Sequence, residues 1–328
     1  MRCFWDERQR LHAPTGEFFN GAMHAAAEHP GRVDAILAGI GSTEAPADLG
    51  IDPLLRVHSQ DYLDFLRSAH AKWKLAGREG DAFPYTFPIV GRRPLKFSRI
   101  DAELGQYSFD TSTPIGPVTW DAAYWSAQTA LAGLRAVAAG ERAAFALCRP
   151  PGHHAGADYL GGYSYLSNAA ICAVAAGKRV AILDVDYHHG NGTQDIVVGR
   201  EDLVFASIHA DPTTDYPFYW GHADESGGNI LNLPLPRGTE WSTYLPALTQ
   251  ALDWIEKSEP ELLIVSYGAD THEADPISHF KLKTSDYAPM ARRIASLGVP
   301  TLVVMEGGYA VDEIGINAVG VLTGFEGR

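Results

Sequence analysis

Cysteine and long apolar runs are both scarce in this chain of 328 residues. Only Cys3, Cys148 and Cys172 occur, and without any CxxC spacing they imply neither a disulfide framework nor a cysteine-based zinc site. No run approaches the roughly 18 apolar residues of a membrane span, and residues 1–7 form no apolar signal segment. The sequence therefore predicts a cytoplasmic protein with no membrane partner.

Positive charge is also in short supply, because 26 lysines and arginines stand against 40 aspartates and glutamates. The formal net charge of −14 repels phosphate backbones and anionic lipids, so nucleic acids and membrane surfaces are disfavoured as partners. The same charge favours a cationic partner, although solubility alone also accounts for an acidic protein. Apolar residues make up 46% of the chain, which excludes a mainly disordered protein.

From about residue 119 onward, short apolar segments alternate with segments of helical pattern. Strands are expected at 145–148, 180–183, 203–208, 262–266 and 301–305. Side chains able to cap the intervening helices stand at Thr119, Asn168, Ser242 and Ser285. Short, nearly continuous apolar strands between helices predict an α/β fold with a mostly parallel sheet covered on both faces.

The first 118 residues are less regular, with one helix expected after a cap at Ser59. Residues 73–100 contain several prolines and glycines and are expected to form a loop. Such an insertion is long enough to be a lid or a dimer contact. No second apolar core is apparent, so residues 1–328 are expected to form a single domain.

Each expected strand is followed, at its carboxyl end, by side chains that can bind a metal or transfer a proton. These clusters occupy 149–154, 184–192, 207–211, 268–272 and 306–309. Ligands of open α/β sheets bind outside the carboxyl ends of the strands, so we expect the clusters to converge on one crevice.

Three of these side chains form a candidate metal set. Asp186 and His188 stand two residues apart just past a strand, so both point to one face. Asp270 arrives from another strand end and completes a mixed oxygen and nitrogen set, and three protein ligands with a vacant fourth position are the layout of a catalytic zinc site. Taken singly, each carboxylate is equally compatible with a helix cap, and the histidine is equally compatible with a place in a packed core. Buried charges cluster only when they are compensated, which favours the metal.

Adjacent His153 and His154, in a Pro-Pro-Gly-His-His turn, suit proton transfer between water and a leaving amine. Asp184 is the candidate partner of His153, and Asn191 is that of His154. Two surface histidines in a loop are the alternative interpretation. Tyr309, after two glycines, can donate a hydrogen bond to an oxyanion, although packing alone also suits a tyrosine there.

The segments 149–155, 184–195, 207–211, 268–276 and 306–309 together resemble the motifs of the zinc-dependent histone deacetylase family. Their order and spacing are closest to its bacterial acetylpolyamine amidohydrolases, and the resemblance covers nearly the whole chain. It implies an arginase–deacetylase fold, with eight mostly parallel strands between helices. It also implies a hydrolase that removes acetyl groups from small cationic amides by metal-activated water. A homodimer in which residues 73–100 narrow the tunnel is a further implication.

The resemblance also assigns roles, residue by residue. One zinc ion per chain is implied at Asp186, His188 and Asp270. The implied catalytic residues are His153, His154 and Tyr309, with His154 the general base and acid and Tyr309 the polariser of the carbonyl. Structural potassium is implied at Asp184, Ser207 and Ile208, and a second, outer potassium at main-chain oxygens near Val197, Arg200 and Leu203. Substrate contacts are implied at Glu17, Glu103, Asp110, Gly162, Tyr163 and Tyr216.

Some features depart from the family pattern or leave alternatives open. Tyr216 stands where the closest relatives carry phenylalanine, and His272 and His279 also differ from them. Within the family, a deacetylase of acetyl-lysine in proteins or peptides remains the alternative, because the acidic charge would attract either substrate. A dinuclear manganese site would need carboxylates where Gly190 and His272 stand. A metal-binding module without catalysis is disfavoured by the complete set of catalytic groups.

Overall fold

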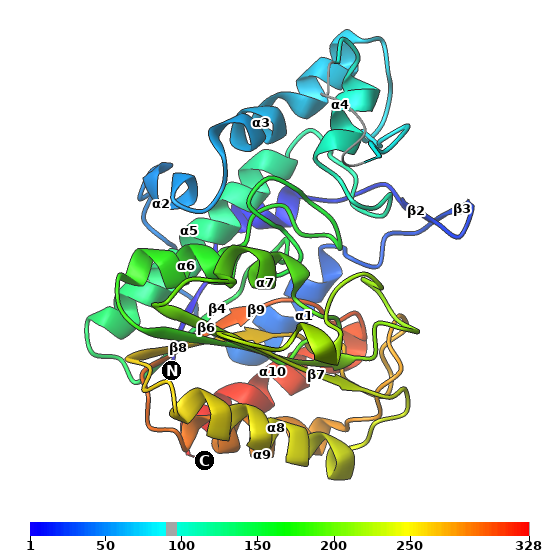
Figure 1. The fold of residues 1–328 in the computed structure, drawn as a ribbon. Coiled ribbons are helices and arrows are strands. Elements are labelled where there is room, and N and C mark those ends of the chain that lie inside the picture. Colours follow the sequence, from blue (N-terminus) through cyan, green and yellow to red (C-terminus); the bar gives the residue numbers. More distant parts are fainter. Residues whose placement is uncertain (90–96, 328) are drawn as a thin grey trace.

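The computed structural model describes residues 1–89 and 97–327 (Figure 1). Its centre is a parallel sheet in the strand order β1-β4-β9-β8-β5-β6-β7, which confirms the predicted α/β class. The strands are β1 (Arg2–Phe4), β4 (Ala143–Ala146), β5 (Val180–Asp184), β6 (Leu203–Ala210), β7 (Ile230–Leu235), β8 (Leu262–Tyr267) and β9 (Thr301–Met305). A separate antiparallel hairpin pairs β2 (Glu17–Phe19) with β3 (Ala22–His24).

Helices cover both faces of the sheet (Figure 1). One face carries α5 (Thr119–Ala138), α6 (Asn168–Ala176) and α7 (Asn191–Val197). The other carries α1 (Gly31–Ile40), α8 (Trp241–Glu256), α9 (Thr284–Ala295) and α10 (Val311–Phe325). Beyond the α5 side lie α2 (Asp52–Leu55), α3 (Gln60–Leu75) and α4 (Ile100–Gln106). In the described part of the chain, none of the helices has both the length and the apolar character of a membrane span.

The alternation of side chains along the strands builds a core on each face of the sheet. In β5, Val180 and Ile182 pack into the core that contains residues of α5 and α6. Ala181 and Leu183 point the other way, into the core shared with α8, α9 and α10. A strand buried on both faces must be apolar at every position, which is why β5 has an unbroken apolar run.

Several helices begin one or two residues earlier than the expected caps predict. Ser59 caps α3 as predicted, because its hydroxyl accepts a hydrogen bond from the N–H three residues on. Thr119 instead lies inside α5, where its hydroxyl accepts from the N–H of Gly116. Ser242 and Ser285 are likewise the second residues of their helices.

The described residues contain seven strands in the central sheet, where the resemblance implied eight. Beyond the edge strand β1, a single parallel bridge joins Phe4 to Glu44. It is made by the Trp5 N–H to the Glu44 carbonyl at 3.0 Å and the Glu44 N–H to the Cys3 carbonyl at 2.9 Å. Pro46 follows two residues later and has no N–H to donate, so the pairing does not extend into a strand.

The segment expected as a loop at residues 73–100 begins inside a helix, because α3 continues to Leu75. Residues 76–89 and 97–99 form neither helix nor strand, apart from one bridge between Ala82 and Ile115. Residues 90–96 of the expected lid or dimer contact lie outside the described residues.

Candidate functional site

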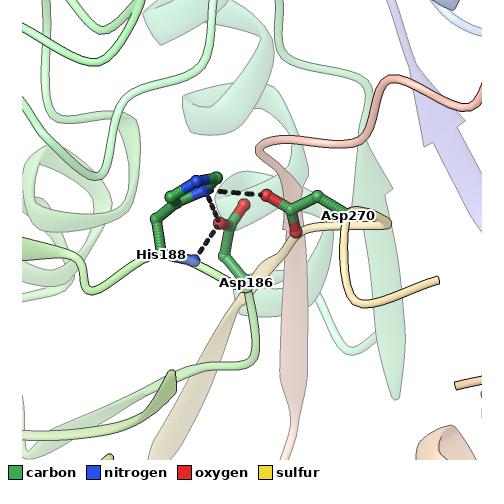
Figure 2. A group of neighbouring side chains, drawn as sticks. All are labelled: Asp186, His188 and Asp270. Carbon is green, nitrogen blue, oxygen red and sulfur yellow. Dashed lines mark hydrogen bonds and ion pairs between the residues drawn. The ribbon is translucent and has the colours of Figure 1, made fainter. Parts of the chain in front are cut away.

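The carboxyl ends of β5 and β8 bring the expected metal ligands together. These neighbouring parallel strands end at the same edge, from which Asp186 and His188 follow β5 and Asp270 follows β8. One ligand atom from each of the three residues lies within 4.8 Å of the others (Figure 2). His188 Nδ1 is 3.0 Å from Asp270 Oδ2 and 3.4 Å from Asp186 Oδ1.

The electrostatics of this cluster fit a bound cation. Both aspartates are fully buried, and burial together with the Asp186 carboxylate raises the pKa of Asp270 to about 8. Two buried carboxylates this close repel each other unless a positive charge lies with them. Two carboxylates and one imidazole are a ligand set that a divalent transition metal accepts. The chemistry of the donors therefore suits a metal such as zinc.

Glycines let the main chain approach the carboxylates closely. The Gly307 N–H donates to Asp186 Oδ2 at 2.9 Å, and the Tyr187 N–H donates to Asp270 Oδ1 at 2.9 Å. A Cβ atom added to Gly268 would lie 2.0 Å from Asp186 Oδ2. The space around the carboxylates thus requires glycine at position 268.

The paired histidines contact the partners expected from the sequence. His153 Nδ1 lies 3.0 Å from Asp184 Oδ2, and His154 Nδ1 lies 2.7 Å from Asn191 Oδ1. Burial alone would lower the pKa of His153, but the carboxylates of Asp186 and Asp184 outweigh it and raise the pKa to about 10. Burial and the nearby His153 hold the pKa of His154 well below its usual range. The two rings therefore differ in charge although they are adjacent.

A buried glutamate that the sequence analysis did not single out holds the histidine turn. Glu306 Oε2 accepts from the N–H groups of Gly152 and His153 at 2.7 and 3.1 Å. Glu306 Oε1 accepts from the Ser266 hydroxyl at 3.0 Å. In the sequence, the one indication of this role is that Glu306 directly follows an expected apolar strand, as Asp184 also does.

Tyr309 is fixed by two residues that were also missed. Its N–H donates to Asp275 Oδ2 at 2.7 Å, and the guanidinium of Arg32 lies 4.8 Å from its ring centre. The same guanidinium donates to the main-chain oxygens of Glu306 and Gly308 at 2.7 and 2.5 Å. Arg32 thus anchors the glycine turn that carries the tyrosine.

A pocket of about 330 Å³ leads to the histidines and the metal cluster. Its walls include most of the residues expected to contact substrate. It is lined by Glu17, Phe19, Asn20, Ser112, His154, Gly162, Tyr163, His188, Tyr216, Phe218, Ile277 and Tyr309.

The three expected acidic contacts differ in their surroundings. Glu17 is 2% exposed, and its Oε2 has no hydrogen-bond partner among the described residues. Asp110 Oδ2 accepts from the Gly162 N–H at 2.7 Å, so it supports the pocket wall from behind. Glu103 does not line this pocket, because it lies on α4 and its Oε1 accepts from Lys72 Nζ at 2.8 Å. Of the three acids, Glu17 alone lines this pocket in the single chain, and Asp110 lies behind its wall.

The residues expected to bind potassium are also adjacent. Asp184 and Ser207 are partners in the register of β5 and β6, and both are fully buried, as is Ile208. The Ser207 hydroxyl lies 2.8 Å from His209 Nδ1.

The main-chain oxygens expected at the outer potassium site converge on a side chain of the protein. Asn229 Nδ2 donates to the carbonyls of Val197, Arg200 and Leu203 at 2.8, 3.0 and 2.9 Å. The Gly199 N–H donates to Asn229 Oδ1 at 3.1 Å, which fixes the orientation of the amide. Because the amide has only two N–H hydrogens, it cannot satisfy all three of these oxygens by itself.

The two other histidines that depart from the family pattern lie away from the metal cluster. His272 Nε2 is 3.2 Å from the Thr284 hydroxyl, and His279 is exposed. Gly190 offers no side chain beside His188, and a Cβ there would lie 2.2 Å from Asp184 Oδ2. The described residues therefore give no second carboxylate pair for a dinuclear site.

Comparison with known proteins agrees with this geometry. The family model described as "Histone deacetylase domain" matches residues 26–324. The chain is 49% identical to "Acetylpolyamine amidohydrolase 1" of Pseudomonas aeruginosa, over 100% of this chain and 99% of the relative. It is 45% identical to "Acetylpolyamine amidohydrolase" of Mycoplana ramosa, over 100% of both chains. The crystal structure of an acetylpolyamine aminohydrolase from Burkholderia pseudomallei has a TM-score of 0.94 at 38% identity, covering 99% of this chain and 98% of that chain.

Proposed function

Because the chain belongs to the histone deacetylase family, we propose that it hydrolyses the acetyl amide of N-acetylated polyamines to acetate and a free amine. The observation that carries this proposal is the pairing of two features in one pocket. The metal cluster with its histidines lies at one end, and the buried Glu17 carboxylate lines the same pocket. A slender substrate with an amide at one end and an ammonium at the other matches both features. A protein deacetylase is less favoured, because the full-length relatives at 45–49% identity are named for polyamines.

Asp186, His188 and Asp270 are proposed to hold one zinc ion. When bound, zinc acts as a Lewis acid toward the amide carbonyl and lowers the pKa of water. His154, which burial keeps neutral, takes a proton from the attacking water and returns it to the departing amine. The Tyr309 hydroxyl donates to the amide oxygen as negative charge develops there. His153 Nδ1 lies against the Asp184 carboxylate, which orients the ring beside His154.

Potassium is proposed to bind beside this centre, at Asp184, Ser207 and Ile208. Asp184 and Ser207 are partners in the register of β5 and β6, and their side chains carry the oxygen atoms that such a cation prefers. A cation there also offsets the buried charge of Asp184.

The aromatic walls of the pocket suit a methylene chain. Tyr163 and Tyr216 are proposed to flank the chain, with Gly162 allowing it to approach His154. Glu17 is proposed to bind the distal ammonium, because a buried carboxylate oxygen without a partner gains most from a cation. The nearby Tyr163 hydroxyl partly offsets the rise in the pKa of Glu17 that burial causes.

Glu17→Gln tests both the substrate class and the role of this carboxylate. It should lower kcat/KM for N-acetylputrescine by about 10- to 100-fold, because a charge-assisted hydrogen bond is lost. The neutral isostere N-pentylacetamide should be affected far less. Steady-state kinetics on both substrates measure the difference, with exposed Glu201→Gln as the matched control. An equal loss on both substrates would contradict ammonium binding, and no wild-type turnover of N-acetylputrescine would contradict the proposed function.

The same pair of enzymes should differ in pH dependence. Burial raises the pKa of Glu17, so its carboxyl takes up a proton at a higher pH than an ordinary glutamate. The wild-type KM for N-acetylputrescine should therefore begin to rise, as pH falls, above the ordinary pKa of 4.5. In Glu17→Gln that rise should be absent.

A homodimer is proposed to form through residues 73–89 and 97–103. This part of the chain exposes Leu75, Tyr85 and Ile89 at 89%, 85% and 70%. Burying them against a second copy would remove apolar surface from water, and Glu103 could then contribute to the partner's pocket. Sedimentation equilibrium should give twice the 35.5 kDa chain mass, and Leu75→Glu should shift it toward the monomer. A monomeric wild type would contradict this proposal.

The cytoplasm is the proposed location of the enzyme. Cys3, Cys148 and Cys172 are buried and unpaired, which suits a reducing compartment.

A further inference from the structure

The Asp110 carboxylate connects two walls of the pocket. Its Oδ2 accepts from the Gly162 N–H at 2.7 Å and from the Tyr216 hydroxyl at 2.9 Å. The hydroxyls of Ser112 and Thr113 donate to the same oxygen at 3.0 and 3.3 Å. This oxygen therefore has four donors from the protein itself.

The two walls that Asp110 joins both lie against the catalytic histidine. Gly162 and Tyr163 have φ angles of +53° and +63°, so this turn has a left-handed backbone that needs support. A Cβ added to Gly162 would lie 2.1 Å from His154 Cδ2. On the other side, the ring of Tyr216 is 5.1 Å from that of His154. Asp110 thus sets the spacing of the passage to His154.

The Tyr216 hydroxyl adds a hydrogen bond to the stacking of its ring on Phe109, whose centre is 5.8 Å away. The preceding Asp215 is anchored separately, because it accepts from the Tyr187 hydroxyl at 2.7 Å and from Arg237 Nε at 2.8 Å. This anchor holds the main chain, whereas the ring reaches across the pocket and ends on Asp110. A phenylalanine would fill the same ring volume without that bond.

We propose that the hydrogen bond between Tyr216 and Asp110 is a clasp that keeps the pocket mouth too narrow for a peptide main chain. Tyr216 is then a specificity-determining residue that excludes acetyl-lysine carried within a peptide. The peptide main chain would have to enter between the joined walls, where Asp110 Oδ2 already accepts from four donors of the protein. This inference rests on the proposed deacetylase function and narrows its substrate class to small amides as opposed to peptides.

The test compares two substrates that carry the same scissile group. The ratio of kcat/KM for a hexapeptide with a central Nε-acetyl-lysine to that for free Nε-acetyl-lysine should be well below one in the wild type. Tyr216→Phe should raise this ratio by about tenfold or more. Tyr219→Phe makes the same chemical change on the same segment, at a side chain that is 84% exposed, and should leave the ratio within about twofold.

A second variant separates the clasp from a general effect of the hydroxyl. In an Asp110→Asn background, Tyr216→Phe should change the ratio much less, because the bond is already disturbed. A ratio that Tyr216→Phe leaves within about twofold of the wild type, or a wild-type ratio near one, would overturn the clasp. The polyamine preference is measured separately, from N-acetylputrescine against free Nε-acetyl-lysine. If the enzyme does not prefer N-acetylputrescine, the proposed substrate class is wrong. The ratio for the peptide and free Nε-acetyl-lysine still tests the clasp.

Discussion

Asp270→Asn is expected to abolish stable zinc binding and to lower kcat/KM for N-acetylputrescine by about 10⁴-fold or more. The substitution keeps the shape of the side chain but removes one of the two negative charges that make the buried cluster attractive to a cation. Without the metal, His154 must take a proton from ordinary water, whose pKa is far above neutral. Metal content by mass spectrometry and steady-state kinetics check the two parts of this prediction.

Stability in the presence of zinc separates a lost ligand from a misfolded protein. A ligand that binds only the folded state raises the melting temperature, so zinc should stabilise the metal-free wild type and leave Asp270→Asn unchanged. Exposed Asp202→Asn makes the same change at the far end of the sheet and should behave as the wild type. A full complement of zinc in Asp270→Asn would show that the cation is held elsewhere.

The interior of the sheet could be predicted because its strands contain short, nearly continuous apolar runs. β9 was expected at 301–305 and is found at Thr301–Met305. The edge strands were missed for physical reasons. β1 has three residues, fewer than a periodic pattern needs, and β7 contains Pro234, which only an edge strand tolerates.

The site was predictable where several chemical groups follow one strand. Asp184, Asp186 and His188 form such a run after β5, and the structure brings Asp270 to them. Single residues supplied by distant segments were not predictable in this way. Arg32, which anchors the glycine turn below Tyr309, stands 276 residues from the Gly308 carbonyl that it binds. Burial of this kind depends on tertiary packing, and no local pattern encodes it.

The same packing buries a charged network beneath the site, centred on Glu28. Its Oε1 accepts from Arg32 Nη1 at 2.8 Å and from Arg149 Nε at 2.7 Å, and all three residues are at most 2% exposed. Burial alone would raise the pKa of Glu28, but Arg149 and Arg32 outweigh it and lower the pKa from 4.5 to about 2. Neither arginine can lose its proton, so the Glu28 carboxylate is needed to offset their buried positive charge.

Glu28→Gln should destabilise the protein by about 3–5 kcal/mol, because it leaves two buried guanidinium groups without a counter-charge. The pKa shift points to a similar size, about 3 kcal/mol, at pH values where the carboxylate is ionised. Glu44→Gln breaks the exposed pair with Arg2, whose side chains are 50% and 42% exposed, and should cost about 1 kcal/mol or less. Urea unfolding at pH 7 compares the two variants with the wild type.

The loss of stability at acid pH tests the network more sharply than unfolding at pH 7 alone. A carboxylate with a lowered pKa stabilises the fold above pH 4.5 and loses that contribution as the pH falls toward about 2. The stability difference between the wild type and Glu28→Gln should shrink over this window, because a protonated glutamate and a glutamine are then nearly equivalent. A difference that stays constant with pH would mean that the side chain acts through its shape and hydrogen bonds. In that case the charge of Glu28 would not be what holds Arg32, and through it the turn of Tyr309, in place.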